Sequence, residues 1–372
     1  MLTYKRKLIL TKAQEERISS WIGACRVVYN MGLEIRIAAY SNLKQVSKFE
    51  LMKQLPTIKY IDWIADVPAQ SLQMTIERLD ASYNKFFRNG AGFPKFASKK
   101  SYKSLLFKQG NTDNTTLIIT IKDNKIKLPK IGILKMFKDA PILGIPKTAT
   151  IKKEPTGYFI CIVCDEKRTI QNHDENQVCG IDMGIANFCV DNNGNLIENP
   201  QHFKKYERQL RIENRSLARK KKGSSRWKKQ AKKLALLHNK IRNVRKDFLH
   251  KESTKLAKQY HTIYVENLKI NNMARNKNLS KHILDCGWGV FRTMLEYKTN
   301  VVRVNPKYTS QTCNECGHVD SASRISQSEF KCTKCGHTAH ADVNGAKNIM
   351  SKGIALNRKR EAVACALVEE LI

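Results

Sequence analysis

Hydrophobic and polar residues alternate in three different ways along the chain, and the first pattern ends near residue 93. It begins with YKRKLIL (residues 4–10), which predicts a short strand. Thr11 follows as a helix N-cap with Gln14 at the capping-box position, so we expect a helix from there to about Tyr40. The apolar residues of this helix recur at the helical period: Ile18, Ile22, Cys25, Val28 and Tyr29.

Two further helices are predicted over residues 47–55 and 68–88, and Pro68 opens the second. This part of the chain holds no catalytic constellation, which favours a recognition or scaffolding role. A Gly/Pro/Lys loop, GFPKFASKK, leads into residues 105–166, where short alternating segments are separated by turn residues. That pattern is typical of an antiparallel β-barrel or sheet. Lysines line these strands, so one face either meets phosphate or is simply solvated.

The third pattern starts near residue 176 with VCGIDMGIANFCVDNNGNLIEN, which predicts two strands, a tight Asn-Asn-Gly turn and a third strand. Residues 204–246 then hold 18 Lys/Arg but only two acids, Glu207 and Glu213. Apolar residues in and just after this run recur at spacings of three and four, which predicts one long helix: Leu234, Leu237, Ile241, Val244 and Phe248. Charge this dense favours contact with a nucleic-acid backbone over a merely solvated face or a membrane surface.

Beyond that helix, HTIYVENLKI predicts a buried strand that ends at Glu266. We expect a helix over about residues 289–298, a strand at 301–305 and a final helical stretch opened by Asp342. No apolar run approaches the roughly 20 residues that a bilayer span needs. The basic N-terminus has only three consecutive apolar residues, so it is not expected to be a signal peptide.

The net charge of the chain indicates which class of partner it binds. In its 372 residues, 67 Lys and Arg stand against 33 Asp and Glu, a net charge of +34. Such an excess points to a polyanion, with nucleic acid favoured over an anionic membrane surface.

Four of the eleven cysteines form two CxxC pairs, Cys313/Cys316 and Cys332/Cys335, with fifteen residues between them. Four thiolates at this spacing predict a tetrahedral zinc site, and the loop between the pairs is long enough for a small β-ribbon. The zinc is expected to be structural because four protein ligands leave no position for water. Cys161 and Cys164 also form a CxxC, but their strand-like setting favours buried apolar cysteines, and the scattered cysteines suit a reducing cytoplasm.

Three acids occupy matching settings. Asp182 in GIDMG and Glu266 in YVENL each end an apolar strand, and Asp342 stands at the start of the last helix, seven residues after Cys335. A buried ionised carboxylate is costly unless a cation pairs with it. Clustered carboxylates are what a pair of Mg²⁺ ions needs to hydrolyse a phosphodiester. A hairpin around Asp182 beside a parallel strand carrying Glu266 is the layout of an RNase H-like fold.

The chain resembles the TnpB (OrfB) proteins of bacterial insertion sequences through its GID-x-G, YVE-x-L, TSQTC-x-x-CG, C-x-x-CG and D-x-N-x-AKNI motifs. Through them it is similar to the RuvC-like core of type V CRISPR effectors. The resemblance implies a transposon-encoded RNA-guided DNA endonuclease of the transposase family, with a guide RNA from its own transposon and a double-stranded DNA target. It implies Asp182, Glu266 and Asp342 as the catalytic, Mg²⁺-binding acids, and the four cysteines as zinc ligands. A cytoplasmic, nucleoid-associated bacterial protein is expected.

The implied architecture is multidomain α/β. A β-barrel wedge domain (1–10 and 95–172) would carry an inserted helical recognition domain (11–94). A RuvC-like, RNase H-like nuclease domain (173–305 and 337–372) would carry the inserted zinc ribbon (306–336).

Two departures from the family pattern flank the ribbon. The helix-to-strand connector near Asn300 is short, and Gly345 stands where alanine is usual, although a helix-interior glycine costs about 1 kcal/mol. Arg324, between the cysteine pairs, is either a substrate contact or a solvated loop residue. Two other functions remain open: a nuclease-silent RNA-guided DNA-binding regulator, and a transposase that transfers DNA strands.

Overall fold

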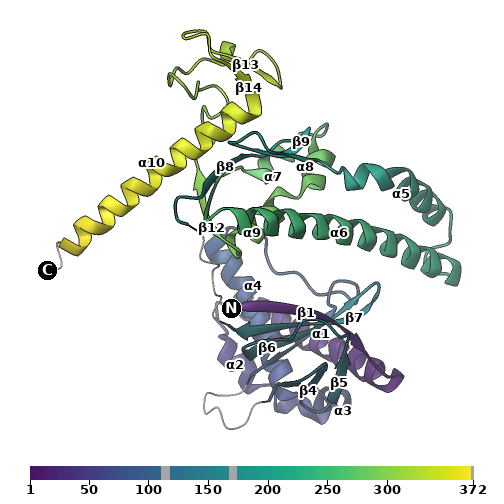
Figure 1. Cartoon of the computed structure of the whole chain (residues 1–372). Coiled ribbons are helices and arrows are strands. Elements are labelled where there is room, and N and C mark those ends of the chain that lie inside the picture. The colour runs from purple at the N-terminus through teal and green to yellow at the C-terminus, as the bar shows by residue number, and fades with distance from the viewer. Residues whose placement is uncertain (110–117, 167–173, 370–372) are drawn as a thin grey trace. The chain divides into compact units, whose positions relative to one another are not determined.

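The computed structural model describes residues 1–109, 118–166 and 174–369 (Figure 1). These residues form two compact units, Met1–Arg168 and Thr169–Ile372. In the described residues, no helix combines the length and the apolar character that crossing a membrane requires.

The first unit is built on a seven-stranded antiparallel sheet with the order β2-β6-β7-β1-β5-β4-β3. Strand β1 joins its two halves, because its first residues pair with β7 and its last two with β5. The strands are β1 (Leu2–Ile9), β2 (Ser104–Lys108), β3 (Thr120–Lys122), β4 (Lys125–Leu128), β5 (Gly132–Met136), β6 (Ile145–Glu154) and β7 (Gly157–Asp165). The expected antiparallel sheet is therefore confirmed, and β2 and β3 are its ends in the described part of this unit.

Strand β7 illustrates the alternation on which the prediction rests. Its even-numbered residues from Tyr158 to Cys164 are buried, whereas Cys161 on the other face is half-buried. These two cysteines thus belong to opposite faces of the strand, as expected.

Helices occupy the part of this unit between β1 and β2. Helix α1 (Lys12–Ser41) starts as predicted: Thr11 accepts a hydrogen bond from the Gln14 amide, and the Gln14 side chain accepts one from the Thr11 amide. Its buried face includes Ile18, Cys25 and Val28. The other helices are α2 (Lys48–Lys53), the 3₁₀ helix η1 (Thr57–Tyr60), α3 (Asp62–Ala65) and α4 (Ala69–Asn89).

The second unit contains a five-stranded mixed sheet with the order β10-β9-β8-β11-β12. Strands β8, β9 and β10 are antiparallel neighbours, whereas β11 runs parallel to both β8 and β12. The strands are β8 (Val178–Asp182), β9 (Asn187–Asp191), β10 (Leu196–Glu198), β11 (Thr262–Glu266) and β12 (Asn300–Val304). This is the predicted hairpin with a third strand, and a parallel strand beside it.

Helices cover both faces of this sheet. Helices α6 (Ser225–Gln259), α8 (Ser280–Cys286) and α9 (Trp288–Glu296) contribute to one core, in which Leu249 and Phe291 pack with Ile181 and Val265. Helix α10 (Ala341–Glu369) contributes to a second core, in which Ile349 packs with residues of β11 and β12. A short helix, α7 (Ile270–Met273), follows β11.

The basic run at 204–246 is divided between two helices, so the prediction of one long helix was wrong for its first part. Helix α5 (His202–Ala218) and α6 pack together as a hairpin (Figure 1). The break is local: Gly223 adopts a φ of +89°, which L side chains disfavour, and the Ser224 hydroxyl caps α6. The apolar seam of α6 packs on α5 through Leu237, Ile241 and Leu210.

Two small strands, β13 (Glu329–Lys331) and β14 (Thr338–His340), form the β-ribbon. They flank the second cysteine pair, so the ribbon does not lie wholly in the loop between the pairs, as the spacing had suggested. That loop also holds the 3₁₀ helix η2 (Ser321–Ser323). Asp342 lies in the first turn of α10.

Candidate active site and metal centre

Two of the predicted acids end neighbouring parallel strands. Ile181 of β8 lies opposite Val265 of β11, so Asp182 and Glu266, the last residues of these parallel strands, lie at the same edge of the sheet. Asp342 comes from the start of α10, which packs against β8. The charges of Glu266 and Asp342 both act on the Asp182 carboxylate. The fold therefore brings together three acids that are distant in the sequence.

Asp182 lies where a negative charge is costly. Desolvation by the surrounding protein raises its pKa to about 7, and repulsion from Glu266 and Asp342 adds to that rise. The Arg324 guanidinium and the backbone amide of Met183 act in the opposite direction but offset only part of the rise. Near neutral pH this carboxylate therefore needs a proton or a cation.

Glu266 is also desolvated, which raises its pKa. The buried Thr309 hydroxyl donates a hydrogen bond to Glu266 Oε1, and Lys352 on α10 supplies a nearby positive charge; both interactions favour the ionised carboxylate. The same hydroxyl lies 2.8 Å from the carbonyl oxygen of Pro306, so its single proton is shared between two acceptors beside each other.

Asp342 faces an arginine from the zinc ribbon. The distance from Arg324 Nη2 to Asp342 Oδ1 is 3.5 Å, and the two side chains are 27% and 17% exposed. Arg324 is thus a partner of the acids, so its interpretation as a solvated loop residue was wrong.

The four predicted zinc ligands converge. Their sulfur atoms all lie within 4.8 Å of one another, with Sγ–Sγ distances of 3.7 Å for Cys313–Cys335 and 3.6 Å for Cys316–Cys332. Four sulfurs at about 2.3 Å from a tetrahedral zinc ion would be separated by about 3.8 Å. The cysteines therefore fit structural zinc. In the described part of the chain, no other group of His, Cys, Asp or Glu brings three ligand atoms this close.

Both cysteine pairs use the same turn. Gly317 and Gly336 each follow the second cysteine of a pair with a positive φ, 71° and 74°. Each glycine amide donates a 3.0 Å hydrogen bond to the carbonyl of the first cysteine, Cys313 or Cys332. This positive φ explains the glycine in each CxxCG motif.

Two asparagines attach α10 to the segment before the first cysteine pair. The buried Asn344 donates to the Thr312 carbonyl (2.8 Å) and accepts from the Asn314 amide (3.0 Å). Asn348 donates to the carbonyls of Thr309 (2.9 Å) and Thr312 (2.6 Å). Through these bonds, the helix that carries Asp342 also positions the hydroxyl beside Glu266. No role was assigned to these asparagines, to Thr309 or to Lys352 from the sequence, although three of the four lie within the TSQTC and D-x-N-x-AKNI motifs.

Three family models match the chain. Residues 161–277 match a family described as a probable transposase, and residues 288–349 match a Cas12f1-like TNB domain. Residues 1–45 match a helix-turn-helix domain. In this structure that last range contains β1 and α1.

Full-length relatives are also similar. A putative RNA-guided DNA endonuclease, InsQ, from Escherichia coli K12 is 32% identical over 367 residues, which cover 92% of this chain and 90% of that protein. A putative RNA-guided DNA endonuclease from Streptomyces pristinaespiralis is 29% identical and covers 95% and 89% of the two chains. A chain in the cryo-EM structure of the Cas12f1-sgRNA-target DNA complex shares the fold, with a TM-score of 0.59 at 14% identity over 92% of this chain and 83% of that chain.

Proposed function

Because the chain belongs to the TnpB (OrfB) family, we propose that it is an RNA-guided DNA endonuclease that hydrolyses phosphodiester bonds at Asp182, Glu266 and Asp342. The observation that carries the proposal is the Asp182 carboxylate, which is desolvated and repelled by the other two acids. Such an arrangement is unfavourable without cations, so its cost argues for a functional site.

The donor set fits Mg²⁺. All three groups offer hard carboxylate oxygens, which this ion prefers. The pKa values of Asp182 and Glu266 are raised, and a bound divalent cation would lower them again. They do not form a single tight cluster, because three ligand atoms within 4.8 Å occur only among the cysteines in the described residues. A wider spread suits two ions about 4 Å apart.

Bound Mg²⁺ would activate a water and stabilise the leaving oxygen. The protein residues define the rest of the chemistry. Asp182 and Glu266 are fixed by the register of β8 and β11, and Asp342 by the first turn of α10. Arg324 can leave Asp342 and contact a phosphate, because a separation of 3.5 Å makes theirs a long ion pair. Thr309 holds Glu266 in place and favours its ionised form.

The zinc centre has a supporting role in this proposal. The segment Pro306–Thr312 joins the ribbon to the nuclease site, because Thr309 binds Glu266 and the asparagines of α10 bind the carbonyls of Thr309 and Thr312. Zinc would therefore hold Arg324 and Thr309 near the acids without taking part in the reaction.

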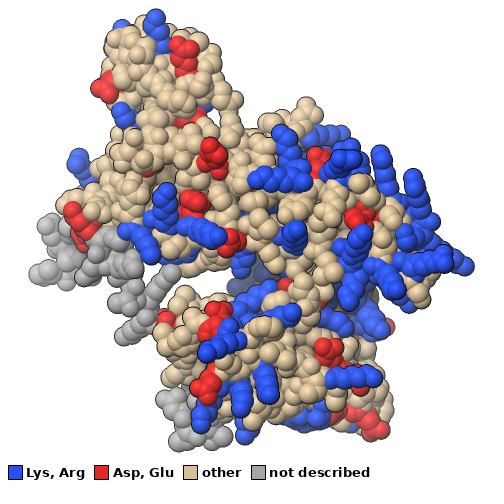
Figure 2. Space-filling model, turned by 45° about the vertical axis from the view of Figure 1, so that its right-hand side comes forward, with Lys and Arg blue, Asp and Glu red and all other residues tan. Residues whose placement is uncertain are grey.

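The α5–α6 hairpin is the proposed contact for the duplex of guide RNA and target DNA. Its Lys and Arg side chains gather on the surface seen in Figure 2. Of the 18 basic residues at 204–246, all except Lys220 and Arg245 are exposed. The two acids of this run are engaged locally: Glu213 pairs with Lys233 at 2.7 Å, and Glu207 pairs with Lys281 at 3.2 Å. The net positive field therefore remains available for phosphates.

The domain roles follow the family. We assign residues 1–10 and 95–172 to a wedge domain and 11–94 to a recognition domain. Residues 173–305 and 337–372 would form the RuvC-like nuclease, with residues 306–336 as its zinc ribbon. The guide RNA would come from the protein's own transposon, and base pairing would read the target sequence.

Sequencing the RNA that copurifies with the protein tests the guided part of this proposal. We expect one transposon-derived RNA, and we expect DNA matched to its guide segment to be cut in Mg²⁺. Binding without cutting would favour the nuclease-silent regulator. Joining of DNA ends without any RNA would favour a strand-transfer transposase.

A further inference from the structure

The segment at residues 85–100, KFFRNGAGFPKFASKK, exposes large aromatic side chains. Phe87 is 72% exposed, Phe93 45% and Phe96 57%. The segment covers the end of α4 and the loop that follows, where Gly90 ends the helix with a φ of 62°. We call it the aromatic loop.

Several of these rings form a preassembled group. Phe86 contacts Phe87 and Phe93 edge-on, with centroid distances of 5.0 and 5.4 Å. Tyr83 lies 5.6 Å from Phe93 and stacks on Phe87 at 6.2 Å, and the Arg36 guanidinium lies 4.9 Å from the Tyr83 ring centroid. Arg36 is fixed in turn by Asp80 at 2.8 Å. Phe87 and Phe93 are therefore held by Phe86 and Tyr83, so binding a planar group to them would cost little ordering entropy.

The charge of the aromatic loop identifies a partner chemistry. The loop contains five basic residues and no acid: Lys85, Arg88, Lys95, Lys99 and Lys100. All five are exposed, and Lys85, Arg88 and Lys95 make no ion pair with a described residue. An apolar protein surface would not need such an excess, whereas a chain of bases and phosphates matches both features.

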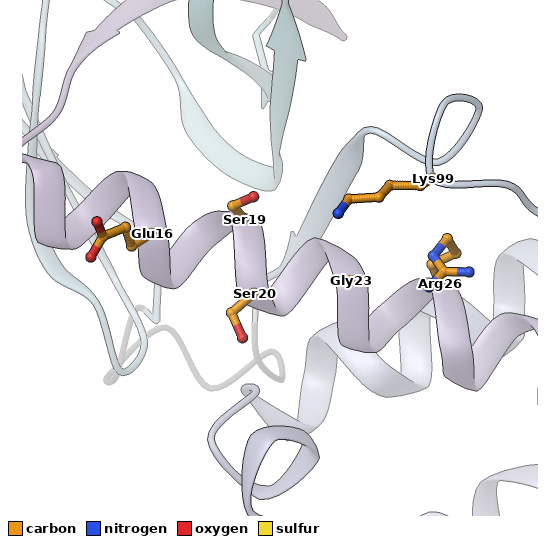
Figure 3. Close-up of a pocket in the computed structure, with 6 residues that line it drawn as sticks. All are labelled: Glu16, Ser19, Ser20, Gly23, Arg26 and Lys99. Atoms are coloured by element: carbon orange, nitrogen blue, oxygen red, sulfur yellow. The ribbon is translucent and has the colours of Figure 1, made fainter. Parts of the chain in front are cut away.

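The positive surface continues onto α1. Lys99 and Arg26 line a pocket of about 440 Å³ together with Glu16, Ser19, Ser20 and Gly23. Figure 3 shows Lys99 extending over α1 with its amino group directed toward Ser19. A Cβ atom at Gly23 would meet nothing within 4 Å, so this stretch of the helix is open. A phosphate next to bases stacked on the aromatic loop would find two cations and two hydroxyls here.

We propose that the aromatic loop binds unpaired nucleotides of the guide RNA, with Phe87 and Phe96 stacking on bases and Lys85, Arg88 and Lys95 contacting phosphates. Stacking needs bases that are not paired, and a folded RNA offers them in its loops and ends, whereas an intact DNA duplex does not. The DNA strand displaced by guide pairing also offers them, and the single-stranded DNA comparison in the test separates the two. This inference rests on the proposed function for the identity of the RNA.

The test uses the full-length protein and a short mixed-sequence single-stranded RNA containing 2-aminopurine, whose fluorescence is quenched by stacking. Phe87→Ala with Phe96→Ala should weaken binding about tenfold or more and relieve the quenching, while the salt dependence keeps its slope. Lys95→Gln should instead reduce the slope of log Kd against log salt by about 0.7. Because Phe87 and Phe96 are largely exposed, the melting temperature should not change.

Phe49→Ala is the matched control, since Phe49 is 65% exposed on α2, next to Glu50. It should leave affinity and quenching unchanged. Wild-type affinity and quenching in the double variant would overturn the proposal. An equal loss of RNA affinity in Phe49→Ala would overturn it as well. A loss seen only with single-stranded DNA of the same sequence would overturn the assignment to RNA. The readout needs no cleavage, so failure of the nuclease proposal would be recognised separately.

Discussion

A Cβ atom added to Gly345 would lie 2.8 Å from Oδ2 of Asp182. The helix that carries Asp342 thus approaches β8 so closely that only glycine leaves room for the carboxylate in its present position. The same close approach recurs along α10. A Cβ atom at Gly180 would lie 2.2 Å from the Ala346 carbonyl oxygen, and one at Gly353 would lie 1.9 Å from the Tyr264 ring. Gly345, a departure from the family pattern, therefore fits the geometry of this site.

Gly345→Ala should separate stability from activity. Alanine favours the helix by about 1 kcal/mol, and the atom it meets is the mobile end of a side chain, so the melting temperature should stay the same or rise. Asp182 would have to turn away, and cleavage should fall at least tenfold and need more Mg²⁺. Initial rates at increasing Mg²⁺ check this, with Gly289→Ala on α9 as the control, where a Cβ atom would lie 3.4 Å from the Ile270 side chain. Normal rates at low Mg²⁺ would mean that the position of Asp182 is not restricted by Gly345.

Asp182→Asn should stabilise the metal-free protein. The carboxylate is desolvated and lies near two other acids, so at pH 8 its charge is a cost that the isosteric amide removes. We expect a gain on the order of 2 kcal/mol, measured by denaturant unfolding with EDTA present. Asp174→Asn, at an exposed position, is the control. A loss of stability in Asp182→Asn would argue against an unpaired acid at this site.

The first unit should lose local stability in acid through Asp66. The hydrogen bond from Arg17 is the largest cause that lowers the pKa of Asp66, and the buried Trp21 indole also donates to it at 2.6 Å. Because the pKa is depressed in the folded state, this contribution is present above the unfolded pKa and is lost as pH falls through the folded one.

Hydrogen exchange of the α1 amides checks this prediction. Protection should decrease below about pH 4, near the unfolded pKa of an aspartate. Asp66→Asn should lower the free energy of opening of the α1 amides at pH 7 by about 1 kcal/mol. In this variant, that free energy should change less than in the wild type as the pH falls. Glu34→Gln, at an exposed position on the same helix, should behave like the wild type. An unchanged acid response in Asp66→Asn would show that other groups control it.

Cys332→Ser should remove zinc and loosen the C-terminal region, since the metal supplies folding energy in such sites. Loss of the ribbon would also release Thr309 from Glu266. Zinc content by mass spectrometry and the melting temperature provide the measurement. Cys161→Ser is the control, because Cys161 belongs to a CxxC in β7 and should not affect zinc. Full zinc content in Cys332→Ser would contradict the predicted ligand set.

Local signals in the sequence were sufficient for most elements. Thr11 with Gln14 marked the start of α1, and the apolar strands ending at Asp182 and Glu266 were expected to be parallel. The break between α5 and α6 was missed because the apolar spacing of residues 234–248 was extended to the whole basic run, and a single glycine such as Gly223 is a weak signal. In the ribbon, pairing across the second cysteine pair depends on turn geometry that spacing does not specify.

The acids were identified from their settings, but their surroundings were not. Arg324 is 18 residues from Asp342 in the sequence, and Thr309 is 43 residues from Glu266. These contacts exist only after the zinc ribbon and α10 have folded together. The cost of a Cβ at Gly345 is likewise visible only once β8 lies beneath the helix.

We propose that Asp182, Glu266 and Asp342 form the active site of a guide-dependent DNA nuclease. The most direct test compares the wild type with Asp182→Ala, each loaded with the copurifying RNA, on matched DNA in Mg²⁺. We predict that the wild type cuts only when the RNA is present, and that Asp182→Ala binds the same DNA without cutting it. Cutting by Asp182→Ala, or cutting by the wild type without RNA, would contradict this account.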